Sequence, residues 1–268
     1  MKRSYYWIFI STLSILSLST VSWVSIKKST VVISGFKADT LSTEAAPKLS
    51  LFDNYVAELY QQANLSSSNL DESVLKKALI GYHNFKKSNL LSVDRAIITI
   101  VDFNKSSREN RLWIIDLDKK QLLFNTLVAH GQGSGDDLAQ NFSDTENSHQ
   151  SSLGFYITNN IYQGKHGKSL VLNGMDKGFN TSAKARSVVV HGAEYVSQDF
   201  IKVHGRLGRS YGCPALPPEL SSQIIDAIKD HTCLFINSSQ SKYTSSYLDQ
   251  SSAESDLLTS SNTRQATL

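Results

Sequence analysis

The chain has 268 residues, of which 40% are hydrophobic and 19% are charged, and it contains only 4 prolines. This composition supports a packed core and excludes a collagen-like, coiled-coil or wholly disordered protein. The formal net charge is +3, and the 27 lysines and arginines form no dense basic run, so no nucleic-acid partner is expected. The 2 cysteines exclude a disulfide scaffold, and neither belongs to a C-x-x-C zinc motif.

The first 26 residues have the pattern of an export segment. Lys2 and Arg3 precede an uncharged stretch over residues 5–26, and two lysines follow it. A basic start before an apolar stretch is typical of a secretory signal, and about 20 residues is also near the length that crosses a bilayer. We therefore expect export to the periplasm or cell envelope, with residues 1–26 acting either as a cleaved signal peptide or as an N-terminal membrane anchor.

Residues 51–90 predict two helices. Apolar residues recur at helical spacing from Leu51 to about Leu65 and from Leu70 to about Lys87. A segment of about 40 residues buries little apolar surface by itself. We expect it to be a helical lead-in that packs on the following domain, with residues 27–50 as a linker before it.

Residues 91–237 predict a mostly-β domain, so the fold class is α+β. Strand-like runs occupy 96–103, 112–117 and 122–128, with a hairpin turn at 118–120; further strands are predicted at 153–157, 169–172, 187–191 and 232–236, and a helix at 218–230. Residues 238–268 hold ten serines and four threonines in 31 positions, and we expect this segment to be a disordered tail.

Twelve of the 14 glycines lie between Gly131 and Gly212, which indicates that functional loops are concentrated there. The repeat Gly131-x-Gly133-x-Gly135 follows a strand but lacks the spacing of a nucleotide-binding loop, and two aspartates come next, where a phosphate needs positive potential. A flexible turn explains this repeat better.

Cys213 is a candidate nucleophile with His191 as its base. A free thiol titrates near ~8.5 and needs a neighbouring base or positive charge to react at neutral pH. The residues alone leave two alternatives open. One is a disulfide from Cys213 to Cys233, since exported proteins often pair their cysteines. The other is a metal site of His191, His204 and Cys213, although their spacing fits no common zinc motif.

His191-Gly192 followed by Ser210-x-Gly212-Cys213 resembles the H-G…S-x-G-C signature of the L,D-transpeptidases, the YkuD-like cysteine enzymes of bacterial cell walls. The resemblance is closest to the murein L,D-transpeptidase catalytic domain family and covers about residues 51–237. It also includes the segments Arg111–Leu117, Val128–Gly131, Ser151–Tyr156, Gly164–Gly167 and Gly205–Ser210.

The resemblance implies a YkuD-like β-sandwich or barrel and a set of site roles. Cys213 matches the nucleophile and His191 the general base, and the carbonyl of Gly192 is expected to orient the imidazole. The N–H groups of Tyr211, Gly212 and Cys213 match the oxyanion hole. No metal and no organic cofactor is implied.

The resemblance also implies a reaction on the tetrapeptide stems of peptidoglycan. The cysteine attacks the carbonyl of the third residue, usually meso-diaminopimelate, and releases the terminal D-Ala. Transfer of the acyl group to an amine of a second stem gives a 3→3 cross-link, whereas transfer to water gives L,D-carboxypeptidase activity. A non-catalytic peptidoglycan-binding protein with the same fold is the alternative from another class. The enzyme is expected to be a monomer.

Ala215 departs from the family pattern, because many members carry an arginine there. Recognition of a substrate carboxylate then needs other residues, and Arg206, Arg209 and Ser210 are the candidates for substrate binding, since two arginines bind carboxylates well.

Three further histidines lie near the signature or in glycine-rich turns. We expect His204 to be a surface residue, while His130 and His166 are candidates for lining the cleft.

Overall fold

The computed structural model describes residues 50–239 and 242–266. The expected signal or anchor at 1–26 and nearly all of the linker at 27–50 lie outside these residues. Within the described ranges, no helix is both long enough and apolar enough to cross a bilayer.

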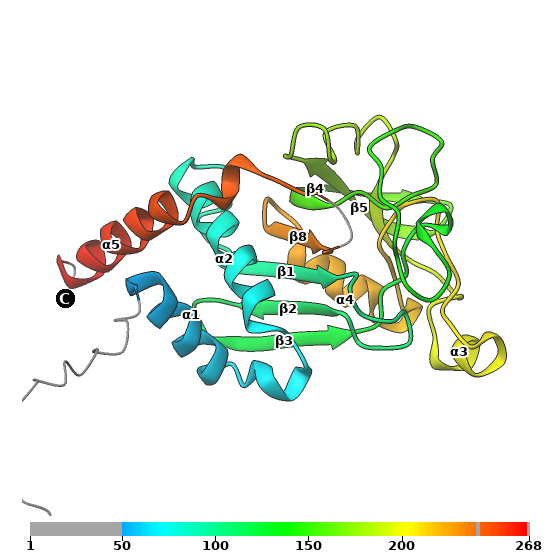
Figure 1. Cartoon of the computed structure of the whole chain (residues 1–268), viewed down its shortest axis with the longest axis horizontal. Coiled ribbons are helices and arrows are strands. Elements are labelled where there is room, and N and C mark those ends of the chain that lie inside the picture. The colour runs from blue at the N-terminus through cyan, green and yellow to red at the C-terminus, as the bar shows by residue number, and fades with distance from the viewer. Residues whose placement is uncertain (1–49, 240–241, 267–268) are drawn as a thin grey trace, which may run out of the picture. The chain divides into compact units, whose positions relative to one another are not determined.

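The described residues form one mixed eight-stranded sheet with the strand order β3-β2-β1-β8-β4-β5-β6-β7 (Figure 1). Neighbouring strands are antiparallel, except that β1 pairs with β8 and β6 pairs with β7 in parallel. Together with the helices on its faces, this sheet confirms the predicted α+β class. The strands are β1 Ile97–Asp102, β2 Leu112–Asp116, β3 Gln121–Thr126, β4 Gly154–Gly164, β5 Gly167–Gly174, β6 Val189–Gly192, β7 Ala215–Leu216 and β8 Cys233–Asn237.

All the strands expected from apolar runs are present, but β4 and β5 extend well beyond theirs. The outer half of β4 is largely exposed, and the two strands continue as a hairpin to the pair Gly164–Gly167. A register shift between Thr158 and Ile161 interrupts their pairing, as a β-bulge does, and bulges bend strands. Because this outer half is polar, hydrophobic runs do not reveal it.

Helices cover both faces of the sheet. α1 Leu51–Gln62 and α2 Glu72–Lys87 pack on one face of the sheet, and α4 Pro218–Ile228 packs on the other face (Figure 1). The short helix α3 Gln198–His204 covers neither face. Side chains of β1 alternate between the two sides: Ile98 and Ile100 join the core under α2, whereas Ile97 and Val101 join the core under α4. Burial on both faces explains why β1 is a continuous apolar run.

Both lead-in helices begin at side-chain caps. Ser50 accepts a hydrogen bond from the Asp53 N–H, and Asp71 accepts one from the Ser73 N–H. Such caps satisfy N–H groups that the first helical turn leaves unpaired and contribute about 1 kcal/mol each. The sequence pattern located both helices correctly.

The C-terminal segment corrects the expectation of a disordered tail at 238–268. A 3-10 helix, η3 Ser246–Leu248, leads into α5 Gln250–Ala266, which packs against α2. His83 Nδ1 lies 2.8 Å from an Asp256 carboxylate oxygen, and the Asn84 amide donates to the carbonyls of Tyr247 (2.8 Å) and Asp249 (2.9 Å). These contacts are mostly polar, so a search for apolar periodicity does not find this helix.

Ala253 is the fully buried apolar residue of α5, with 0% exposure. Replacing Ala253 with Glu buries a charge against α2, and we expect the free energy of unfolding to fall by about 2 kcal/mol or more in urea denaturation. Leu258→Glu, at a position 50% exposed on the same helix, is the control and should change stability by less than about 0.5 kcal/mol. Equal, small effects of the two substitutions would show that α5 does not pack on α2 in solution.

Candidate active site

Cys213 lies in the irregular loop between α3 and β7, and backbone hydrogen bonds hold this loop at both ends. Before the cysteine, the Ser210 N–H donates to the His130 carbonyl (3.0 Å), and the Gln132 N–H donates to the Ser210 carbonyl (2.8 Å). After the cysteine, β7 forms a bridge with Ala129. The segment 129–132 therefore fixes the loop on both sides of Cys213.

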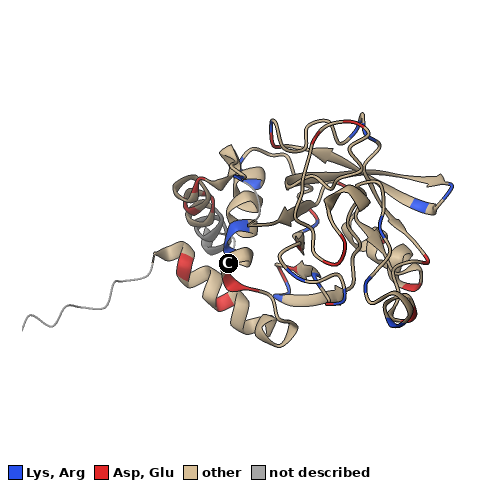
Figure 2. Ribbon diagram, turned by 45° about the vertical axis from the view of Figure 1, so that its right-hand side comes forward, with Lys and Arg blue, Asp and Glu red and all other residues tan. Residues whose placement is uncertain are grey.

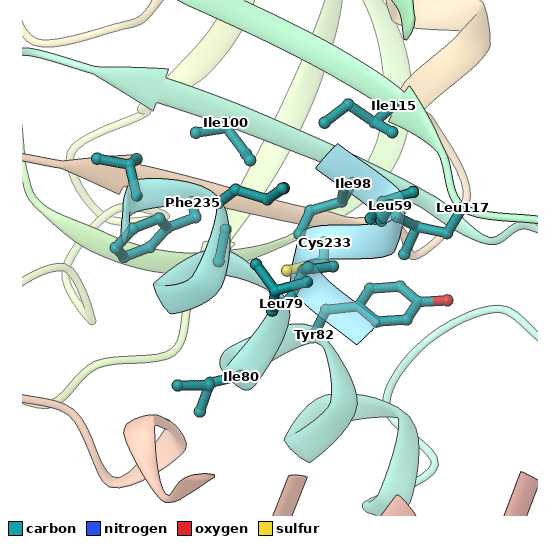
Figure 3. Close-up of a cluster of buried hydrophobic side chains, with 14 of the residues drawn as sticks. Leu59, Leu79, Ile80, Tyr82, Ile98, Ile100, Ile115, Leu117, Cys233 and Phe235 are labelled. Atoms are coloured by element: carbon teal, nitrogen blue, oxygen red, sulfur yellow. The ribbon is translucent and has the colours of Figure 1, made fainter. Parts of the chain in front are cut away.

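The two cysteines are free, which excludes the disulfide alternative. Cys233 lies on β8 inside the hydrophobic core, among residues such as Leu79, Tyr82 and Ile98 (Figure 3). Cys213 is half-buried and lies in the loop before β7, a strand that does not neighbour β8 in the sheet. Cys233 thus acts as a small core residue, and Cys213 is the thiol open to chemistry.

The Cys213 sulfur lies against the start of β6. The Val189 N–H donates to Sγ (3.5 Å), and the thiol donates to the Ser187 carbonyl (3.7 Å). His191 follows Val189 by two residues, so both side chains lie on the same side of β6. In the parallel register, His191 is opposite Ala215, two residues beyond the cysteine. The structure therefore places Cys213 and His191 at the same edge of the sheet.

Gly192 fixes the tautomer of the buried His191 ring. His191 Nδ1 lies 2.9 Å from the Gly192 carbonyl oxygen, and since a carbonyl only accepts, Nδ1 carries the proton and Nε2 is the basic nitrogen. Burial lowers the pKa of His191, and the hydrogen bond to Gly192 opposes this shift. At neutral pH the imidazole is accordingly uncharged and able to accept a proton.

The Cys213 thiol is also neutral at rest. Burial raises its pKa, while the Val189 N–H and the positive charges of Arg186 and Lys165 oppose that shift. Within the described part of the chain, no hydrogen bond joins Cys213 to His191. Catalytic hydrogen bonds often tighten only in the complex with substrate.

Arg186 is a cation near Cys213 that the sequence patterns do not identify. One of its terminal nitrogens donates to the Ser143 carbonyl (2.6 Å) and to the Ser152 hydroxyl, and the other donates to the Gln150 carbonyl (2.5 Å). A Cβ on Gly212 would lie 3.1 Å from this second nitrogen. Arg186 therefore ties the loop around residues 143–152 to the Cys213 loop and leaves a positive charge beside it.

Ser210, a candidate for substrate binding, forms hydrogen bonds within its own loop. Its side chain is buried, and its hydroxyl donates to the Cys213 carbonyl (2.6 Å) and accepts from the Gly212 N–H (3.0 Å). The hydroxyl thus shapes the loop itself. The Gly212 N–H, expected in the oxyanion hole, is used by this contact, whereas the N–H groups of Tyr211 and Cys213 have no acceptor among the described residues.

Gly212 permits the close contacts that this loop requires. Its φ of +120° is rare for other residues, and a Cβ would lie 2.7 Å from the Gln150 carbonyl oxygen. Next to it, Tyr211 is 68% exposed and stacks on His149, with 4.3 Å between ring centroids.

The candidate arginines lie in the first part of the same loop and are already paired. Arg209 donates to Asp136 (2.7 Å) and to the Gly135 carbonyl (2.9 Å), and Arg206 approaches the same aspartate at 3.8 Å. Two guanidinium groups against one carboxylate leave one net positive charge. They line an open hollow of about 330 Å³ with Gln132, Tyr195, Phe200 and Gly208.

The other candidate histidines differ in their surroundings. His204 is exposed, as expected. His130 is buried, with Nδ1 2.8 Å from the Arg111 guanidinium, and burial together with that cation lowers its pKa to about 3, so it does not line a cleft. His166, in contrast, stacks on His191, with 4.5 Å between ring centroids.

The metal alternative finds no support in the described residues, which contain no group of three or more His, Cys, Asp or Glu side chains able to hold an ion.

The glycine repeat at 131–135 forms a turn and contains the 3-10 helix η2 Gln132–Ser134. A Cβ on Gly131 would lie 2.9 Å from Gly212. The repeat therefore allows the two loops to approach each other. In the view of Figure 2, lysines and arginines are interspersed with aspartates and glutamates along the ribbon.

A half-buried free thiol against the strand that carries a buried, oriented imidazole suits a cysteine acyltransferase or hydrolase. The family model described as "L,D-transpeptidase catalytic domain" matches residues 66–237, well over half of the chain. The chain belongs to the L,D-transpeptidase catalytic domain family, and its sheet and helices form the YkuD-like fold. Members of this family act on peptidoglycan stem peptides outside the cytoplasm.

Solved structures of L,D-transpeptidases and of one cell shape determining protein resemble the chain at low identity. The Mycobacterium smegmatis L,D-transpeptidase is 10% identical, with 54% of this chain and 59% of that chain covered and a TM-score of 0.35. LdtMt1 in complex with imipenem is 12% identical, with 53% and 59% covered and a TM-score of 0.33. A variant of the Campylobacter jejuni cell shape determining protein Pgp2 is 12% identical, with 68% and 63% covered and a TM-score of 0.39. The chain spans about three fifths of the length of each. No curated protein matches the sequence.

The raised pKa of Cys213 has a direct consequence for alkylation. We expect the rate of iodoacetamide labelling of Cys213 to rise continuously past about pH 8.5, because the reactive thiolate forms only above the pKa of an ordinary thiol. Trypsin separates the two cysteines into the peptides 210–229 and 230–242, and mass spectrometry measures each rate. Cys233, buried in the core, is the internal control and should react only after unfolding. A rate that is already constant below pH 7 would instead show a thiolate–imidazolium pair at rest.

Proposed function

We propose that the protein is a cysteine-dependent L,D-transpeptidase that acts on tetrapeptide stems of peptidoglycan. The observation that carries this proposal is the free, half-buried Cys213 thiol, in the signature position of the family and against the strand that bears His191. A structural or purely binding protein needs neither a free thiol at this position nor an imidazole whose Nε2 is left basic.

The reaction begins at the carbonyl of the third stem residue. His191 Nε2 accepts the thiol proton as Cys213 Sγ attacks, and the tetrahedral intermediate collapses to a thioester. The proton then passes from Nε2 to the nitrogen of the departing D-Ala. In the second half, Nε2 accepts a proton from the attacking amine of another stem, the new amide forms, and the sulfur recovers its proton. The neutral resting state of both groups suits these transfers.

The oxyanion of the tetrahedral intermediate needs hydrogen-bond donors that are free before the reaction. The N–H groups of Tyr211 and Cys213 meet this condition, whereas the Gly212 N–H is bound to Ser210. Removal of one such donor typically costs about 100-fold or more in rate. The charge of Arg186 adds positive potential at the same loop.

The remaining assignments follow from the same proposal. The partners are peptidoglycan stem peptides, and Arg206 and Arg209, with one net positive charge over the hollow beside the loop, bind an anionic group of a stem. The protein works as a monomer in the periplasm or cell envelope, with residues 5–26 as the export signal or membrane anchor. Water in place of the acceptor amine gives L,D-carboxypeptidase activity at the same site.

The test uses a muropeptide tetrapeptide and mass spectrometry of the products. We expect Cys213→Ala and His191→Ala to abolish release of D-Ala, while the circular dichroism spectrum stays that of the wild type. Cys233→Ser is the matched control and should keep turnover, because its sulfur lies in the core. A cross-linked dimer among the wild-type products supports the transpeptidase, and a tripeptide alone supports the carboxypeptidase.

Intact-protein mass after incubation with a carbapenem separates the enzyme from a binding protein. We expect an acyl adduct on Cys213, because a strained β-lactam carbonyl accepts the same attack as the stem carbonyl. Unchanged turnover in the Cys213→Ala variant would refute the mechanism. Binding of stem peptides without turnover or adduct would favour the non-catalytic alternative.

A further inference from the structure

The motif Gly164-Lys165-His166-Gly167 forms the tip of the β4–β5 hairpin, and the reaction described above gives it no role. Gly164 pairs with Gly167, whose φ of +74° closes the turn, so Lys165 and His166 are the two residues between the strands. The His166 ring lies nearly parallel to the His191 ring, with an interplanar angle of 27°. The hairpin tip therefore reaches the edge of the sheet where β6 meets the Cys213 loop.

Lys165 differs from the other lysine of this hairpin in having no partner. Lys168 pairs with Asp226 on α4 at 2.5 Å. Lys165 is exposed, and its ammonium forms no ion pair and no hydrogen bond with any residue that the structure describes. Its three N–H donors are thus open to a ligand.

The other cations around Cys213 are not equally open. Arg186 donates to backbone carbonyls and serine hydroxyls on both terminal nitrogens. Arg206 and Arg209 share Asp136. A carboxylate that binds near the thiol therefore finds unused donors at Lys165, whereas the arginines first have to release existing partners.

The position of Lys165 also fits one particular carboxylate. Burial has the larger effect on both groups, raising the pKa of Cys213 and lowering that of His191, and the charge of Lys165 acts on both in the lowering direction. When the thiol attacks the third residue of a stem, the terminal carboxylate belongs to the next residue, and consecutive Cα atoms are only about 3.8 Å apart. The hairpin tip that carries Lys165 also carries His166, which stacks on His191, so a stem bound for attack brings this carboxylate to the same edge of the sheet.

Building on the proposed function, we propose that Lys165 binds the terminal carboxylate of the D-Ala that leaves the donor stem, and that His166, stacked on His191, positions the hairpin for this contact. The lysine then supplies the carboxylate recognition that the methyl group of Ala215 cannot give. Because the bound carboxylate lies one residue beyond the attacked carbonyl, this contact selects tetrapeptide stems over longer ones.

The experiment compares two donors, a tetrapeptide stem with a free terminal carboxyl group and the same stem with a terminal carboxamide. We expect Lys165→Gln to lower kcat/KM for the free acid by at least about tenfold, mainly through KM, since a hydrogen bond to a charged group is lost. On the carboxamide, Lys165→Gln and the wild type should be equal. Lys165→Arg should keep most activity on the acid, and Lys77→Gln, exposed on α2, is the surface control and should match the wild type on both donors.

A binding measurement separates this proposal from the proposed function. In the Cys213→Ala background, calorimetry measures the affinity for each stem. Lys165→Gln should weaken binding of the free-acid stem, and the unsubstituted lysine should bind the carboxamide stem more weakly than the free acid. The two changes together should cost no more affinity than either one alone. If the wild type shows no turnover but its binding of the stem depends on Lys165, the role of Lys165 is supported and the proposed reaction is refuted. Equal losses on acid and carboxamide, no loss on either, or no binding of the free acid at all would overturn the role of Lys165.

Discussion

The parallel pairing of β6 with β7 decides where the sulfur of Cys213 lies. β7 is only two residues long, and its contacts with His191 and Gly192 on one side and with Ala129 on the other hold the end of the loop. The Val189 N–H then reaches the sulfur from the same strand that carries the imidazole. Backbone contacts thus hold the two segments that carry Cys213 and His191.

A second constraint is electrostatic. Burial raises the pKa of the Cys213 thiol and lowers that of His191, so both groups are uncharged near neutral pH. In the proposed reaction the proton transfer is part of the attack on substrate, and the charges of Arg186 and Lys165 oppose the cost of forming a buried thiolate. Positive charge next to the sulfur also suits an anionic peptide, so one arrangement serves both activation and recognition.

The sequence predicted the fold well wherever burial dictates apolar runs, as in β1 and β8, and wherever caps and helical periodicity coincide, as in α2. It missed α5, because Ala253 and a set of polar contacts hold that helix. It also missed the outer half of β4, which is largely exposed, and the two ends of β5, which are not fully buried. The signature pattern located Cys213 and His191. Arg186 could not be found in this way, because its nearness to Gly212 depends on how two distant loops pack. Ser210 was assigned to substrate because it belongs to the signature, yet its hydroxyl supports the loop.

The central claim is that Cys213 carries the acyl group during the reaction, and rapid quenching of the wild-type protein with a tetrapeptide donor tests it most directly. Acid quenching preserves a thioester, and trypsin releases Cys213 in the peptide 210–229, apart from Cys233. The account predicts that this peptide transiently gains the mass of the tripeptide acyl group as D-Ala appears. Release of D-Ala with no such mass on the peptide at any quench time would contradict it.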